Sequence, residues 1–204
     1  VLNGFGKKIV ADYLAVNLID KIFTNPNYYS GLEVVFGVFG YSLQIYMDFS
    51  GYTDIAIGIA LLFGYRLKTN FNSPYKATST SEFWKRWHIS LSSWLQEYLY
   101  IPLGGNKSGT IGSYICLAII CLFMVLLSGK IWLLIAFIIC TVLLVILFYT
   151  LPKFKQQINT NVNLMVTMLL GGLWHGSSWL FLIWGGLNGI GLIAHKYWKK
   201  ISPF

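Results

Sequence analysis

The residue best suited to chemistry in this sequence is a histidine inside an apolar stretch. Residues Leu164–Ala194 contain no Lys, Arg, Asp or Glu, and His175 lies near their middle. An ionisable ring at membrane depth is costly to place, and it therefore marks a functional site by default. Because imidazole exchanges protons near neutral pH, His175 could act as a general base that activates a hydroxyl for acyl transfer. A packing histidine that hydrogen-bonds a backbone carbonyl is the alternative.

Two carboxylates form a second group of candidates. Asp48 and Asp54 lie within Gly31–Tyr65, a stretch with one further charged residue. Intramembrane carboxylates could orient a histidine, bind a cation or relay protons. They could equally pair with Lys or Arg of a neighbouring helix and fix the packing. By position alone, His88 is more typical of a membrane interface than of a catalyst, and His195 resembles an interface anchor.

Other kinds of chemistry have no motif in the sequence. It contains no glycine-rich phosphate loop, no nucleophile elbow and no Cys/His spacing typical of a metal site. We therefore expect no metal and no tightly bound cofactor. The net charge of +8 is spread over the ends of apolar runs rather than gathered in one patch, so we expect no nucleic-acid partner.

The composition is that of a membrane protein. Hydrophobic residues make up 56% of the chain and charged residues 11%, whereas a soluble domain has about 25% charged residues. Ile111–Ser128 and Ile131–Thr150 are uncharged runs joined by Gly129-Lys130, and they predict a transmembrane hairpin with a tight turn. Gly31–Tyr65 is too long for one straight span, and we expect two segments broken near Ser50-Gly51. Phe5–Phe23 predicts a helix that could lie at the interface.

The histidine candidates are carried by two further predicted elements. Ser79 and Glu82 have the spacing of a capping box, which predicts a helix starting there and continuing to about residue 99. Its aromatic residues fall on one arc and Arg86 on the opposite side, so we expect this helix to lie along the membrane surface. His88 falls at the edge of the arc, and Tyr100–Asn106 ends the helix.

The apolar run around His175 is too long for a single crossing. A straight helix over Leu164–Ala194 would be about 46 Å long, against a hydrocarbon core of about 30 Å. A single crossing would also put the lysines that follow it on the outer face, against the positive-inside tendency. A break at Gly171-Gly172 or Gly176-Ser177 would let the chain dip in and return, which predicts a re-entrant segment beside a cavity.

Four sequence motifs occur in a fixed order along the chain, and together they resemble one family. They are Ser42–Asp54 (SLQIYMDFSGYTD), Phe83–Ser92 (FWKRWHISLS), Tyr98–Asn106 (YLYIPLGGN) and Gly172–Gly176 (GLWHG). The set resembles the bacterial branch of the membrane-bound O-acyltransferase (MBOAT) family. The resemblance is strongest to members that take part in alginate O-acetylation and weaker to those of teichoic-acid D-alanylation.

The resemblance implies an all-α fold, a polytopic transmembrane helical bundle with interfacial and re-entrant helices around a tunnel. It implies that His175, in the Trp-His-Gly motif, is the essential catalytic residue and that His88 lies near the same tunnel. We expect Asp48, Asp54, Arg86 and Trp174 to support them.

The resemblance also implies a reaction and its participants. An acetyl group would pass from a cytoplasmic thioester donor, acetyl-CoA, toward hydroxyls of an extracellular polysaccharide. The partners would be the lipid bilayer, the polysaccharide acceptor and an extracytoplasmic polysaccharide O-acetyltransferase, at the bacterial inner membrane. Two other functions stay open from the residues themselves: a proton-coupled transporter or channel subunit, and a non-catalytic scaffold for a soluble acetyltransferase.

Family members are longer than this chain. We therefore expect residues 1–204 to form a single membrane domain that is a partial family core, without its N-terminal helices and C-terminal end. Residues 111–150 are expected to be an extra transmembrane hairpin.

Overall fold

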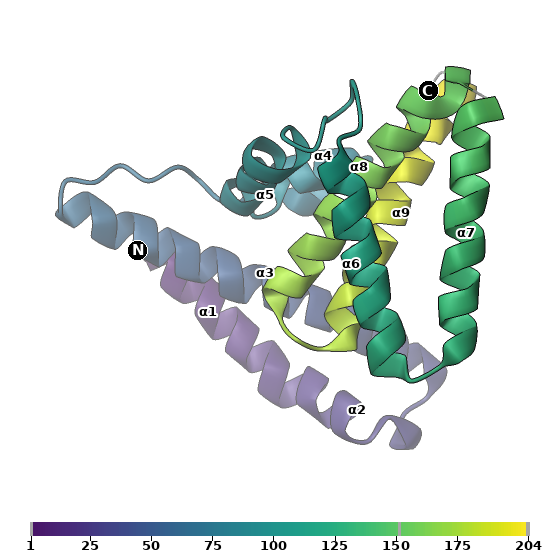
Figure 1. The fold of residues 1–204 in the computed structure, drawn as a ribbon. Coiled ribbons are helices and arrows are strands. Elements are labelled where there is room, and N and C mark those ends of the chain that lie inside the picture. Colours follow the sequence, from purple (N-terminus) through teal and green to yellow (C-terminus); the bar gives the residue numbers. More distant parts are fainter. Residues whose placement is uncertain (1, 151, 203–204) are drawn as a thin grey trace. The chain divides into compact units, whose positions relative to one another are not determined.

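All regular secondary structure in the described part of the chain is helical. The structure is a computed structural model that describes residues 2–150 and 152–202; at 127, 133, 137, 144, 145, 147–149, 152 and 153 only the backbone is described. The α-helices, labelled in Figure 1, are α1 (Leu2–Leu14), α2 (Asp20–Thr24), α3 (Gly31–Leu62), α4 (Thr80–Arg86), α5 (Ile89–Leu95), α6 (Ile111–Ser128), α7 (Ile131–Thr150), α8 (Pro152–His175) and α9 (Trp179–Ile201).

The described residues divide into two compact units. Unit 1 comprises residues 1–75 and 86–90, and unit 2 comprises residues 76–85 and 91–204. The single membrane domain over 1–204 stays a prediction, and its residues 1, 151, 203 and 204 lie outside the described part of the chain.

The first predicted helix of unit 1 is confirmed. The chain is helical from Leu2 to Thr24, with a π-helical turn at Ala15–Ile19 between α1 and α2. It stops at Asn25, whose backbone leaves the helical region just before Pro26. The sequence Asn-Pro-Asn thus ends the helix as expected.

The predicted break near Ser50-Gly51 is wrong, because α3 is one continuous helix from Gly31 to Leu62. Gly51 serves a different purpose. A Cβ atom on Gly51 would lie 2.8 Å from the carbonyl oxygen of Gly4 in α1, and one on Gly4 would lie 2.6 Å from that of Gly51. The glycine therefore allows two helices to touch through their backbones, which a small residue does without interrupting the helix.

The start of α3 is fixed by a capping box. The Ser30 hydroxyl accepts from the Glu33 backbone amide, and the Glu33 carboxylate accepts from the Ser30 amide at 2.8 Å. Within the described residues, α3 is the one helix long and apolar enough to cross a membrane. Ile111–Leu126 and Leu134–Leu143 are shorter apolar stretches.

The predicted single helix from Ser79 to about residue 99 is only partly correct. It starts as expected, with the Glu82 amide donating to the Ser79 hydroxyl at 3.1 Å. It then breaks at Trp87-His88, where His88 has a φ of +43°. Because α4 ends at Arg86 and α5 begins at Ile89, the continuous helical wheel does not describe where His88 lies.

The helical hairpin at 111–150 is confirmed with its predicted boundaries. Helices α6 and α7 are joined by Gly129 and Lys130, and Gly129 takes a φ of +63°. Glycine adopts this left-handed conformation without steric cost, so it ends α6 and turns the chain back. That this hairpin crosses a membrane stays a prediction.

The predicted break in the long apolar run is also found, at the second of the two expected places. Helix α8 ends at His175, Gly176–Ser178 reverse the chain, and α9 begins at Trp179. Figure 1 shows α8 and α9 running side by side in opposite directions. A Cβ atom on Gly172 would lie 2.3 Å from the carbonyl oxygen of Phe181, so these two helices approach closely along their glycines.

The core of unit 2 lies where the chain between α5 and α6 meets α8. Leu103, Val162 and Val166 form a buried apolar cluster. Beside it, the fully buried Asn163 donates to the carbonyl oxygens of Gly105 at 3.0 Å and Ser108 at 2.9 Å. The Gly-Gly-Asn turn is thereby attached to α8.

Candidate functional site

His175 is the last residue of α8, at the tip of the α8–α9 hairpin. Its ring is edge-on to Trp174 at 5.0 Å and to Trp184 at 5.1 Å, and nearly parallel to Phe181 at 6.2 Å between centroids. Three aromatic rings therefore fix its orientation. Gly176 leaves the space that Phe181 occupies, since a Cβ atom there would lie 2.6 Å from its ring.

His175 is exposed in this chain. Neither of its ring nitrogens hydrogen-bonds any described residue. A histidine kept only for packing was expected to bond a backbone carbonyl, and that bond is not among the described contacts. The imidazole is thus oriented by apolar rings while its nitrogens remain available to a ligand.

The predicted supporting residue Trp174 is 62% exposed and contacts His175 through its ring edge. A second tryptophan, Trp184, was not predicted from the sequence and contacts His175 as well. Trp184 lies between His175 and Trp84, whose centroid is 5.7 Å from that of Trp184. Trp84 belongs to the Phe-Trp-Lys-Arg motif, so this series of rings joins two of the four sequence motifs within unit 2.

His88, in unit 1, is half-buried, and its ring lies 4.7 Å from that of Phe49 in α3. The neighbouring Trp87 inserts among aromatic residues and is edge-on to Phe71 at 5.1 Å. The two motifs around Asp48 and His88 therefore meet in one aromatic cluster. His88 and His175 belong to different units.

Arg86 and the residues after it are held against the preceding loop. Arg86 donates through its guanidinium to the carbonyl oxygen of Asn72 at 3.1 Å, and its own carbonyl accepts from the Asn72 amide at 2.9 Å. Asn70 accepts from the amides of Ile89 and Ser90 on the far side of the break. These bonds hold the backbone on both sides of His88, whose φ is positive.

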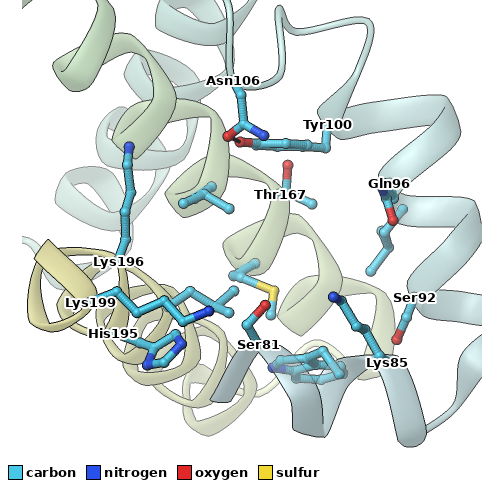
Figure 2. A pocket seen from close by; sticks show the side chains of 15 residues that line it. Ser81, Lys85, Ser92, Gln96, Tyr100, Asn106, Thr167, His195, Lys196 and Lys199 are labelled. Carbon is cyan, nitrogen blue, oxygen red and sulfur yellow. Dashed lines mark hydrogen bonds between the residues drawn. The ribbon is translucent and has the colours of Figure 1, made fainter. Parts of the chain in front are cut away.

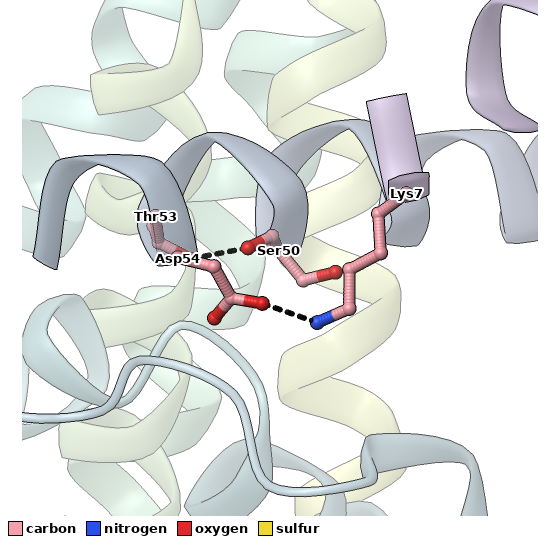
Figure 3. Close-up of polar contacts among 4 residues, drawn as sticks. All are labelled: Lys7, Ser50, Thr53 and Asp54. Carbon is pink, nitrogen blue, oxygen red and sulfur yellow. Dashed lines mark hydrogen bonds and ion pairs between the residues drawn. The ribbon is translucent and has the colours of Figure 1, made fainter. Parts of the chain in front are cut away.

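Asp48 and Asp54 pair with lysines of α1, as the packing alternative predicts. Asp54 accepts from the Lys7 ammonium at 2.7 Å, and Asp48 accepts from that of Lys8. Figure 3 shows the Lys7–Asp54 pair between the two helices. The hydrogen bond that Lys8 donates to Asp48 raises the pKa of Lys8 above its ordinary value of 10.5. Both carboxylates therefore fix the contact of α1 with α3.

Sequence reasoning missed a basic cavity in unit 2, drawn in Figure 2. It has a volume of about 510 Å³, and Lys85, Lys196 and Lys199 line it. Burial raises the pKa of Tyr100, also in its wall, to about 12, so the phenol stays protonated and donates to Asn106 at 2.8 Å. Lys85 belongs to α4, whereas Lys196 and Lys199 belong to α9, and only the tertiary structure brings them together.

The described residues show no group of three or more His, Cys, Asp or Glu side chains that could hold a metal ion.

Comparison with known proteins gives these features a family context. Residues 1–150 match the sequence profile of the membrane-bound O-acyltransferase family. A probable alginate O-acetylase from Pseudomonas putida is 39% identical over 96% of the chain and 30% of its own length. A peptidoglycan O-acetyltransferase from Helicobacter pylori is 37% identical over 97% of the chain and 28% of its length.

A more distant relative is a teichoic acid D-alanyltransferase from Bacillus subtilis, 23% identical over 80% of the chain and 31% of its own length. The chain thus spans about 30% of the length of the curated relatives it matches. The alignment to the Pseudomonas putida relative covers 196 of 204 residues and so includes the His175 region, which lies beyond the family profile match. The chain belongs to the membrane-bound O-acyltransferase family.

Proposed function

We propose that this chain is part of a multi-pass O-acyltransferase that moves an acetyl group toward hydroxyls of an extracellular polysaccharide. Two of the relatives above are named for O-acetylation, one of alginate and one of peptidoglycan. Both are polymers outside the cytoplasm, so the same class of acceptor is proposed for this chain. His175 is assigned as the general base, and His88 as a second residue of the reaction.

The exposed imidazole of His175 is the observation that carries this proposal. It lies at the tip of a helical hairpin, with aromatic rings against its sides and no described partner on either nitrogen. A neutral imidazole in that position can accept the proton of an acceptor hydroxyl. The hydroxyl oxygen then attacks the thioester carbonyl carbon, the C–S bond breaks, and the thiolate leaves and takes up the proton from the imidazolium.

The remaining participants are proposed from the family resemblance. Acetyl-CoA is the proposed donor on the cytoplasmic side of the bacterial inner membrane. An extracytoplasmic polysaccharide O-acetyltransferase is the proposed partner that completes the transfer. The α6–α7 hairpin is proposed as a transmembrane addition to the family core.

A proton-coupled transporter is less well supported. A relay needs carboxylates that can gain and lose protons, but Asp48 and Asp54 each hold a lysine ammonium. A non-catalytic scaffold would not need an imidazole with available nitrogens.

The test replaces His175 by Ala and, separately, by Gln in the complete protein, expressed in the cells that naturally produce it. Polysaccharide O-acetyl content is measured together with the abundance of the protein in membranes. Gln keeps hydrogen-bonding capacity but cannot act as a base near pH 7, so we expect both variants to abolish acetylation at normal abundance. Ser177→Ala, in the same turn, is the control and should acetylate normally.

Acetylation that survives in His175→Gln would refute the general-base assignment. Acetylation that survives in both variants would exclude His175 from the reaction and favour the scaffold function.

A further inference from the structure

The cavity in unit 2 gathers basic side chains from two helices far apart in the sequence. Lys85 comes from α4, whereas His195, Lys196 and Lys199 come from the last turns of α9. In Figure 2 the ammonium groups of Lys85 and Lys199 point toward the middle of the cavity. Its volume of about 510 Å³ is in the range of small-molecule sites rather than of a single ion.

No described residue neutralises the positive charge of this cavity. None of the described residues in its wall is acidic. Lys85, Lys196 and Lys199 form no ion pair with any described residue, although Lys196 donates to the Asn161 side chain at 3.1 Å. Basic side chains grouped without a carboxylate create a local positive potential that attracts anions.

The wall also offers neutral hydrogen-bond donors. Ser81 contributes a hydroxyl group and Gln96 a side-chain amide, whereas the one hydroxyl hydrogen of Thr167 is already donated to the carbonyl oxygen of Asn163 at 2.7 Å.

We propose that this cavity binds a phosphate-bearing ligand, whose oxygens accept from Lys85 and Lys199, while Lys196 in the wall adds positive charge. Phosphate oxygens are strong acceptors, and hydrogen bonds to them from ammonium groups are charge-assisted. The same chemistry is offered by two sources, a soluble phosphate ester or pyrophosphate and the headgroup of an anionic lipid.

The electrostatics of Lys196 agree with an anionic occupant. Burial lowers the pKa of Lys196 from 10.5, and the nearby Lys200 lowers it further. A bound anion would offset both effects by placing a counter-charge beside the ammonium. The site is also joined to His175, because Trp84 in its wall contacts Trp184 and Trp184 contacts His175.

The experiment measures binding directly and so does not depend on acyl transfer. The complete protein is purified from the cells that naturally produce it in a nonionic detergent. Binding of inorganic pyrophosphate is then measured by calorimetry at fixed ionic strength. Lys196→Gln/Lys199→Gln should weaken binding by roughly tenfold or more, since it removes the charge-assisted bond from Lys199 and a second positive charge from the wall. The control, Lys107→Gln/Lys155→Gln, removes two exposed charges outside the cavity and should bind as the wild type does.

A second arm uses lipid nanodiscs of phosphatidylcholine with or without phosphatidic acid, read by co-purified lipid. Lysine-dependent enrichment of phosphatidic acid without pyrophosphate binding supports the site with a lipid headgroup as its source. If neither probe binds more strongly to the wild type than to the Lys196/Lys199 double variant, the proposal is overturned. Citrate binding as tight as that of pyrophosphate, lost in the same variant, overturns the assignment to phosphate. The milder Lys199→Gln variant, at an exposed position, repeats each comparison if the double variant does not fold.

Discussion

The side-chain amide of Asn163 donates to the carbonyl oxygen of Gly105 at 3.0 Å, although the two residues are 58 positions apart. The same amide donates to Ser108, and its oxygen accepts from the Ser113 hydroxyl at 2.7 Å. One fully buried residue thus connects a loop, the start of α6 and the middle of α8. Asn106, within that loop, lines the basic cavity, so Asn163 helps to hold one wall of the proposed binding site.

Replacing Asn163 by Ala should destabilise the protein strongly. Each buried polar group left without its partner costs about 1–3 kcal/mol, and the carbonyl oxygens of Gly105 and Ser108 both lose a donor. The free energy of unfolding, measured by chemical denaturation in detergent, should fall accordingly. Asn188→Ala is the control, because Asn188 makes one exposed bond to its own helix. Equal stability of the two variants would contradict the role of Asn163.

Gly185→Ala should separate α8 from α9, whereas Gly186→Ala should be tolerated. A Cβ atom at Gly185 would lie 2.4 Å from the carbonyl oxygen of Met168, which is backbone and cannot move aside. At Gly186 the nearest atom is a Leu169 methyl at 3.7 Å. We expect a loss of about 1–3 kcal/mol for the first variant and no loss for the second, measured by thermal unfolding. A loss at Gly186 as large as at Gly185 would argue against this packing.

The positive φ of His88 predicts that Gly is better tolerated there than Ala. Both variants lose the contact with Phe49, so their difference isolates the backbone. His88→Gly should be about 1 kcal/mol more stable than His88→Ala, because only glycine adopts this conformation freely. At Ser90, inside α5, the order should reverse. His88→Ala as stable as His88→Gly, or more stable, would contradict backbone strain at His88.

The ammonium of Lys196 should lose its proton below pH 10.5, because burial and then Lys200 lower its pKa. Below the pKa of Lys196 in the folded state, the ammonium is charged in both the folded and the unfolded protein. The full cost of burying this charge then lowers the stability of the fold. Between that pKa and 10.5 the unfolded chain binds more protons, so this contribution to stability improves as pH rises. Amine-reactive labelling of Lys196 against pH, read by mass spectrometry, gives its titration.

Lys200→Gln should move that titration of Lys196 upward, since one of its two causes is removed. Lys155→Gln, which removes a lysine of α8 that does not line the cavity, should leave it where it was. A titration of Lys196 unmoved by Lys200→Gln would contradict the proximity of the two ammonium groups.

Prediction from the sequence was most accurate where a single local rule determines the structure. The α6–α7 hairpin has its predicted boundaries because two uncharged runs flank a glycine that can take a positive φ. The reversal after His175 was predicted from the length of the apolar run and a Gly-Ser pair. Each of these depends on residues that are close together in the chain.

Prediction failed where contacts between residues distant in the sequence determine the structure. Gly51 looks like a helix breaker until Gly4 of α1 is found against it. The break at His88 is held by Asn70 and Asn72, which lie in a separate loop. The basic cavity joins lysines of α4 and α9, and no spacing within one motif could indicate that contact. The catalytic assignments of His175 and His88 stay predictions.

The alternation of helix directions in unit 2 has a consequence for how the chain can be tagged. Helices α6 and α7 form one hairpin and α8 and α9 form the next, so each pair returns the chain to the end from which it started. The number of passes from Ile111 to Ile201 is therefore even, whatever depth of lipid each helix reaches. A reporter domain joined after Ile201 should face the same compartment as one inserted just before Ile111.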